Sequence, residues 1–172
     1  KSLLSPFKYQ SYAIPTFEEV IALAKQKSKE LGRTIGIYPE TKHPSFHEAL
    51  NLHITDKLLA ALEVAGWNNR EAPVFIQSFE VSNLQYIRSK STVKTIQLLG
   101  CYDVALNGDL IFSVPKGEFI SDGMPYDWYL KGDNRDFGFF ITAEGLDFVK
   151  TYATGIGPWK PFIIPYAAID VN

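Results

Sequence analysis

The chain has 172 residues, a formal net charge of −2 and a single cysteine, Cys101. Its length suffices for one domain with a hydrophobic core, and 46% hydrophobic with 21% charged residues is an ordinary globular composition. The charge argues against a general nucleic-acid binder, which needs a basic surface, and one cysteine excludes an internal disulfide or a cysteine-based zinc site. No apolar run approaches the ~20 residues that a membrane span needs.

Helices and strands are predicted to alternate along the first hundred residues. Residues 1–14 show no periodicity and are predicted to be a loop, after which Thr16 and Glu19 form a capping box. Three helices are predicted, over residues 17–31, 55–65 and 81–89. Three short apolar strands are predicted, over residues 35–38, 74–77 and 95–99. This order of elements is typical of a parallel α/β sheet or barrel.

Polar side chains lie within, at the end of or just after each predicted strand. Glu40 and Lys42 follow the first, Gln77 and Ser78 end the second, and Gln97 lies in the third. Parallel α/β folds keep their functional groups at the carboxyl ends of the strands. Glu40 and Lys42 point the same way if the backbone stays extended, and they suit a hard metal ion and a phosphate oxygen. The alternative interpretation is an exposed ion pair, which would contribute little.

From residue 101 to 141 the alternation stops, and the segment is rich in glycine, aspartate and aromatic residues. It is predicted to be a long loop inserted after a strand, with a small hairpin around Asn107-Gly108, and such loops are usually lids or binding loops. Residues 133–136 could coordinate calcium, but a polar turn is the better interpretation. Thr142 is predicted to cap another helix, and residues 154–160 a strand end with a tight loop.

Other kinds of site are weaker hypotheses. His43 and His47 are four residues apart, but Pro44 disfavours a helix that would put them on one face, so we expect them and His53 to be surface or hydrogen-bonded residues. No HExxH, GxGxxG or P-loop pattern is present, and Ser78 lacks the glycines of a nucleophile elbow. Trp159 is interpreted either as lining a pocket or as an aromatic core residue.

Five sequence blocks, in this order and spacing, resemble the glycerophosphodiester phosphodiesterases. They are IPTFEEVI (14–21), IGIYPETKHPSFH (35–47), VFIQSFE (74–80), TIQLLG (95–100) and GIGPWK (155–160). The likeness is greatest to the periplasmic or secreted bacterial branch and its plant relatives. It therefore implies a periplasmic or secreted location, with a cytoplasmic one still open.

The resemblance implies a TIM-type (β/α)8 barrel that hydrolyses glycerophosphodiesters, small-molecule substrates, to glycerol 3-phosphate and an alcohol. It implies a divalent cation, calcium or magnesium, with Glu40 as a metal ligand. Lys42 matches the lysine that faces the phosphate. Gln77 and Phe79 match a block that lines the site, and Trp159 is a further candidate substrate-binding residue.

The chain departs from the family's pattern in three respects. The family's two catalytic histidines, one in an HRG strand, its other carboxylate ligands and its last two strands, which would follow Trp159, have no match here. The resemblance therefore implies a single incomplete barrel domain over residues 1–172, about strands four to six with the long loop after the sixth. No catalytic residue is predicted in this segment, and we expect the segment alone to be inactive.

Two alternatives stay open, and both ends of the chain bear on them. One is a non-catalytic module that binds a phosphate or phosphodiester, and the other is a related barrel phosphodiesterase acting on a phospholipid or sphingolipid. The chain begins at Lys1 rather than Met and stops abruptly at Asn172, so we expect both ends to be cut. An HRG block before Lys1 would favour the enzyme.

Overall fold

A computed structural model describes residues 13–164 of the chain, and residues 1–12 and 165–172 lie outside the described part. Most of the loop predicted for residues 1–14 therefore falls outside it. The chain groups into two compact units, residues 1–35 and residues 36–172. None of the helices in the described part combines the length and hydrophobicity of a membrane span.

In the first unit, residues 13–35 are described and contain helix α1 (Phe17–Leu31), which begins as predicted. The Thr16 side chain accepts a hydrogen bond from the Glu19 N–H at 3.2 Å, and the Glu19 carboxylate accepts one from the Thr16 N–H at 2.8 Å. This reciprocal pair satisfies two donors that a helix start leaves free. Gly32 ends the helix with φ 62°, a left-handed conformation that glycine adopts without steric cost.

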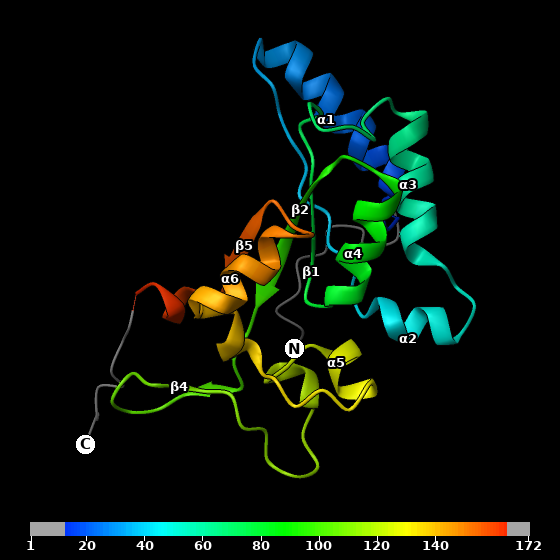
Figure 1. The fold of residues 1–172 in the computed structure, drawn as a ribbon. Helices are drawn as coiled ribbons and strands as arrows, with labels where there is room; N and C mark the ends of the chain where they lie inside the picture. Colours follow the sequence, from blue (N-terminus) through cyan, green and yellow to red (C-terminus); the bar gives the residue numbers. More distant parts are fainter. Residues whose placement is uncertain (1–12, 165–172) are drawn as a thin grey trace, which may run out of the picture. The chain divides into compact units, whose positions relative to one another are not determined.

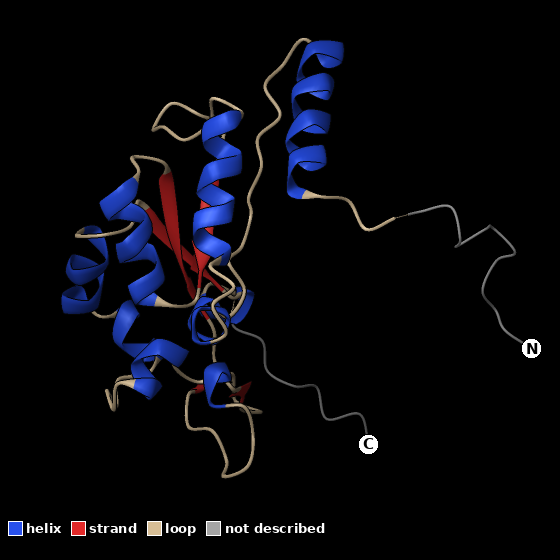
Figure 2. Cartoon of the chain, turned by 90° about the vertical axis from the view of Figure 1, so that its right-hand side faces the viewer, coloured by secondary structure: helices blue, strands red, loops and turns tan. Residues whose placement is uncertain are grey.

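The second unit is built on a parallel sheet with the strand order β1-β2-β5 (Figure 1). Its strands are β1 (Phe75–Ser78), β2 (Lys94–Leu99) and β5 (Gly155–Pro158). Helix α4 (Val81–Lys90) connects β1 to β2 and packs against both, and α6 (Ala143–Lys150) packs against β5. Figure 2 shows the strands of this sheet in red beside the helices. The predicted strands over 74–77 and 95–99 are therefore confirmed within one residue at each end.

The strand predicted over residues 35–38 needs a correction. The segment lies parallel to β1, but it forms only isolated bridges, from Ile37 to Val74 and from Glu40 to Gln77. Pro39 explains the interruption, because proline has no N–H to donate to the neighbouring strand. The segment is also less buried than its apolar sequence suggests, since Tyr38 is 50% exposed.

Helices α2 (Pro44–Ala49) and α3 (Ile54–Val64) follow this segment and contact each other. The second was predicted, whereas the first corrects the expectation that Pro44 would prevent a helix. Pro44 occupies the first helical position, where the missing N–H has no helical partner to lose. His43 precedes the helix with φ 45°, so it lies outside the helix that holds His47.

The segment over residues 101–141 is more ordered than the predicted loop. The predicted hairpin is confirmed as β3 (Asp103–Val104) paired with β4 (Leu110–Ile111). Beyond it come η2 (Ile120–Asp122), α5 (Tyr126–Leu130) and η3 (Phe137–Ile141). A further turn, η4 (Lys160–Phe162), follows β5. The correction arises because the aromatic residues of this segment pack against one another across many residues of chain, which no local period indicates.

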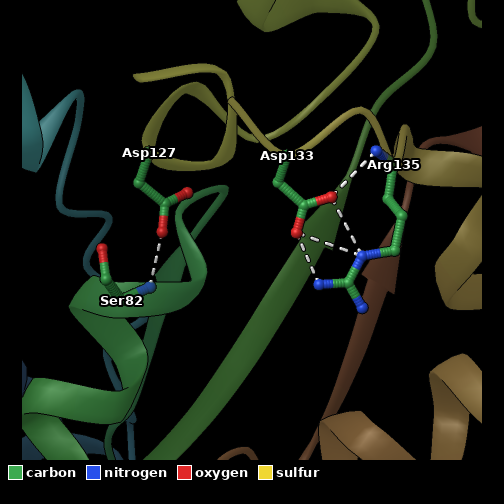
Figure 3. Close-up of polar contacts among 4 residues, drawn as sticks. All are labelled: Ser82, Asp127, Asp133 and Arg135. Atoms are coloured by element: carbon green, nitrogen blue, oxygen red, sulfur yellow. Dashed lines mark hydrogen bonds and ion pairs between the residues drawn. The ribbon is translucent and has the colours of Figure 1, made fainter. Parts of the chain in front are cut away.

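An aromatic cluster holds this segment together. The buried Trp128 ring stacks on Phe140 with centroids 5.0 Å apart, and the Arg135 guanidinium lies 4.2 Å from the Trp128 centroid. The Nε and Nη2 atoms of Arg135 also donate hydrogen bonds to the Asp133 carboxylate, and the shortest N···O distance is 2.6 Å (Figure 3). The polar turn predicted for residues 133–136 is confirmed by the Arg135 N–H, which donates to the Asp133 carboxylate.

Candidate functional site

A cavity of about 410 Å³ opens at the carboxyl ends of the parallel strands, within the size range of small-molecule sites. One side, which we call the strand-end wall, consists of residues 40–44, 79–80 and 100–101. The other side, the loop wall, consists of Phe119, Ser121, Asp122 and Tyr126. The cavity therefore joins the sheet to the 101–141 segment, as expected for a loop that contributes to binding.

Glu40 and Lys42 lie together in the strand-end wall, as their spacing predicted. The Lys42 Nζ atom is 3.4 Å from Oε1 of Glu40, and the Lys42 side chain is 66% exposed while that of Glu40 is 26% exposed. Thr41 between them is buried, which follows from the alternation of side chains along extended backbone. The arrangement presents a carboxylate and an ammonium group to the same cavity.

Glu40 also fits one position in the coordination of a cation. Its Oε1 atom is buried and accepts no hydrogen bond from the described residues, although it forms an ion pair with the Lys42 ammonium 3.4 Å away. A buried carboxylate oxygen without a hydrogen bond is suited to a hard metal ion. Within residues 13–164, however, no three histidine, cysteine, aspartate or glutamate side chains are placed to hold a metal together. Glu40 can therefore supply one ligand, and the described residues do not complete the set.

Glu80 is a second carboxylate in the strand-end wall, and it was not among the predicted site residues. It is buried, and its Oε2 atom accepts hydrogen bonds from the N–H and the hydroxyl of Ser45. Burial raises the pKa of Glu80, and the charge of Asp127 raises it further, while the Ser45 hydrogen bonds and Lys131 lower it. Its position at the end of the VFIQSFE block (74–80) was the only sequence signal for it.

Asp127 of helix α5 is also buried, and its side chain lies beside the first turn of helix α4 (Figure 3). Its Oδ2 atom accepts a hydrogen bond from the Ser82 N–H at 2.7 Å. Glu80 occupies the N-cap position of α4, but its side chain does not cap the helix. Asp127 of α5 therefore takes the place of the local cap and puts negative charge at the positive end of the helix.

The aromatic candidates lie beside the cavity. Phe79 lines it, and the Lys42 ammonium is 5.7 Å from the Phe79 ring centroid. Trp159 lines an adjoining cavity of about 330 Å³ that shares Phe79, Gly100 and Cys101 with the first. Since Trp159 is 45% exposed, it is a wall residue, and the core interpretation was wrong.

Gln77 stands apart from these candidates. It is absent from the residues that line either cavity, and its side-chain N–H donates to the Tyr38 carbonyl at 3.2 Å. Its only described role is thus to link β1 to the segment that carries Glu40. Substrate binding by Gln77 stays a prediction.

The three histidines are separated by the fold. His43 is exposed and lines the 410 Å³ cavity next to Lys42, which the sequence did not indicate. His47 is half-buried in α2, and its ring meets that of Phe46 edge-on. The Nδ1 atom of His53 lies 2.7 Å from Oε2 of Glu48. Proximity in sequence therefore does not bring them into one cluster.

Comparison with known proteins gives consistent results. The model of the "Glycerophosphoryl diester phosphodiesterase family" matches residues 2–120. A glycerophosphodiester phosphodiesterase of Arabidopsis thaliana is 28% identical over 93% of this chain and 40% of its own length. Those of Haemophilus influenzae and Treponema pallidum are 28% and 27% identical, over 89% and 92% of this chain and 39% and 42% of their own lengths. The chain thus spans about two fifths of the length of these relatives.

Proposed function

The chain belongs to the glycerophosphoryl diester phosphodiesterase family, and on that basis we propose that it is part of an enzyme that hydrolyses glycerophosphodiesters to glycerol 3-phosphate and an alcohol. The extended segment over residues 37–40, β1 and β2 would form about strands four to six of a (β/α)8 barrel, with the 101–141 segment after the sixth. In such barrels the active site lies at the carboxyl ends of the strands, which is where the 410 Å³ cavity lies.

One observation carries the proposal: Glu40 and Lys42 face this cavity together from the end of one extended segment. A phosphodiester is anionic, so the exposed Lys42 ammonium is suited to bind a phosphoryl oxygen. During hydrolysis the oxygen of water attacks phosphorus and the bond to the alcohol oxygen breaks. Lys42 would stabilise the negative charge that develops on the phosphoryl oxygens in that step.

Glu40 would hold a divalent cation, calcium or magnesium, together with ligands outside the described residues. When bound, the cation would supply positive charge against the phosphodiester. Phe79 would form an apolar floor for the carbon atoms of the substrate. Trp159 would do the same in the adjoining cavity.

Proton transfers to the departing alcohol and from the attacking water need an acid and a base. None of the described residues is assigned to these roles. We propose that they lie in parts of the protein outside this chain, because the relatives are much longer than the matched region. A non-catalytic phosphodiester-binding module remains the alternative outcome.

The test uses the full-length protein that contains this chain. Release of glycerol 3-phosphate from glycerophosphocholine is measured with calcium and with magnesium, alongside substrate binding by calorimetry. Lys42→Met should weaken substrate binding and turnover, while the control Lys57→Met, on the exposed surface of α3, should match wild type. Binding of the diester without release of glycerol 3-phosphate under either cation would instead establish a binding module.

A further inference from the structure

A buried hydrogen-bonded relay connects helices α3 and α4 to the residue between Glu40 and Lys42. The Thr41 hydroxyl donates to Oδ1 of Asn83 at 2.6 Å. The Asn83 Nδ2 atom donates in turn to the Thr55 hydroxyl oxygen at 2.7 Å. Thr41, Asn83 and Thr55 are only 3%, 7% and 2% exposed, so water has little access to their polar atoms.

This relay restricts how the backbone at Thr41 can turn. The Thr41 N–H donates to the Gln77 carbonyl at 3.0 Å, which fixes the main chain against β1. The Thr41 hydroxyl is held toward the interior, because an unpaired hydroxyl or amide there would be costly. Its neighbours Glu40 and Lys42 must then point to the opposite side, into the cavity.

A second contact holds the same segment a few residues later. Glu80 accepts the Ser45 N–H at 3.0 Å, at the start of α2. Glu80 and Asn83 lie within the first turn of α4, so a single helix start holds the segment at both Thr41 and Ser45. His43 lies between the two contacts in the left-handed conformation, with φ 45°. A non-glycine residue keeps that conformation only where the surrounding structure enforces it.

We propose that Asn83 is a positioning residue for the reaction, which orients Glu40 and Lys42 through the hydroxyl of Thr41. The inference rests on the proposed function for the roles of Glu40 and Lys42. Side chains one step behind a metal ligand typically fix its direction, and their loss weakens metal affinity or activity.

Tyr86 provides a matched comparison on the same helix. Its hydroxyl also joins α4 to α3, donating to Oδ1 of Asp56 at 2.6 Å, but no hydrogen bond connects it to Thr41 among the described residues. If Asn83 acted only by fastening α4 to α3, loss of the Tyr86 hydroxyl would change the same measurements in the same direction, by less because Tyr86 is 39% exposed. If Asn83 acts through Thr41, loss of the Tyr86 hydroxyl will leave them unchanged.

The experiment uses the full-length protein with the variants Thr41→Val, Thr41→Ser, Asn83→Ala and Tyr86→Phe. Thr41→Val is nearly isosteric, so it tests the hydroxyl even if Asn83→Ala fails to fold. The first measurement is amide hydrogen exchange over residues 37–43 without added cation. The second is the cation concentration for half-maximal activity, together with KM and kcat.

Thr41→Val and Asn83→Ala should speed exchange in residues 37–43 by about tenfold, because a buried hydrogen bond near these amides is lost. They should also raise the half-maximal cation concentration or KM by about tenfold. Thr41→Ser keeps the hydroxyl and should stay close to wild type, as should Tyr86→Phe.

Wild-type exchange and cation dependence in Thr41→Val would overturn the inference. Equal losses in Thr41→Val and Thr41→Ser, or in Tyr86→Phe, would overturn it too, since the hydroxyl of Thr41 would not be the acting group. If the wild-type protein hydrolyses no glycerophosphodiester, the proposed function fails. The exchange measurement still decides whether Asn83 holds the segment.

Discussion

The two walls of the 410 Å³ cavity are held by different forces. In the strand-end wall, backbone hydrogen bonds to β1 and buried polar side chains such as Thr41 and Glu80 fix the chain. The loop wall belongs to a segment that is held mainly by aromatic packing around Trp128. Polar networks specify direction, whereas apolar packing supplies stability with less directional control. Glu40 and Lys42, the two groups proposed to bind the cation and the phosphate, therefore lie on the wall whose geometry is more tightly specified.

Removing the centre of the aromatic cluster should have the largest effect. Trp128→Ala deletes a buried ring that stacks on Phe140 and lies under Arg135, and it should cost about 3–5 kcal/mol of unfolding free energy. The control Leu130→Ala changes an exposed residue of the same helix and should cost little. Urea denaturation measures the cost.

Limited proteolysis of Trp128→Ala then tests the separation of the two walls. New cleavage sites should fall within residues 101–141 and not within residues 37–45. Cleavage in both regions at the same rate would show that the walls form one cooperative unit.

A smaller loss of unfolding free energy is expected at Gln97, which binds the Phe79 carbonyl of the strand-end wall. The Tyr152 hydroxyl donates to Oε1 of Gln97 at 2.9 Å, and Nε2 of Gln97 donates to the Phe79 carbonyl at 3.0 Å. Tyr152→Phe leaves a buried amide oxygen unpaired, which should cost about 1–3 kcal/mol. Thermal or urea denaturation checks this, and a cost indistinguishable from zero would mean that the Gln97 amide finds another donor.

Glu80 should make stability depend on pH in a direction opposite to that of most carboxylates. Burial, the largest cause, raises its pKa in the folded protein, so the folded state holds the proton longer than the unfolded state does. Stability from this group is therefore full below the ordinary glutamate pKa and decreases as pH rises toward the folded pKa. Glu80→Gln should flatten this decrease, which begins as pH rises above the ordinary glutamate pKa.

The control for this measurement is Glu71→Gln, at an exposed position. Urea midpoints are compared across pH for both variants and wild type. The same slope in Glu80→Gln and in wild type would show that Glu80 does not govern the effect.

The smallest effect is expected at the outer ion pair of the 101–141 segment. Asp133→Asn removes the charge that pairs with Arg135, but this pair is partly exposed, so the cost should be at most about 1 kcal/mol. Arg135 keeps its contact with the Trp128 ring. Arg135 lowers the pKa of Asp133, so any stability from the pair should be lost as pH falls through that lowered pKa. Denaturation at low and high salt checks the size, and a larger cost that is insensitive to salt would contradict it.

The sequence predicted those parts of the molecule that depend on local patterns. Neighbouring residues were enough to predict three features: the capping box at Thr16, the strands over 74–77 and 95–99, and the shared direction of Glu40 and Lys42. Helix α2 was missed because Pro44 was interpreted as a helix breaker rather than as a first helical residue. The left-handed backbone at His43 leaves no such local signal.

The sequence predicted that the 101–141 segment contributes to binding, but not which of its residues form the loop wall. Phe119 and Tyr126 line the cavity from a segment that aromatic contacts such as that of Trp128 with Phe140 hold together, and no local period marks such contacts. Asn83 looked like an ordinary polar helix residue, since its partners lie 42 and 28 residues earlier in the chain. Side chains that act through distant partners are therefore the ones that periodicity overlooks.

The cap that Asp127 provides for α4 has a consequence for the order of folding. The Ser82 N–H finds its carboxylate 45 residues further along the chain. During synthesis, the ribosome therefore completes α4 well before it makes the residue that satisfies the helix start. Contacts of such long sequence separation form slowly, because the entropy of closing the loop is lost before the contact forms. The first turn of α4 should thus be among the last parts of this unit to become protected during folding, even though its neighbours in β1 lie close by in sequence.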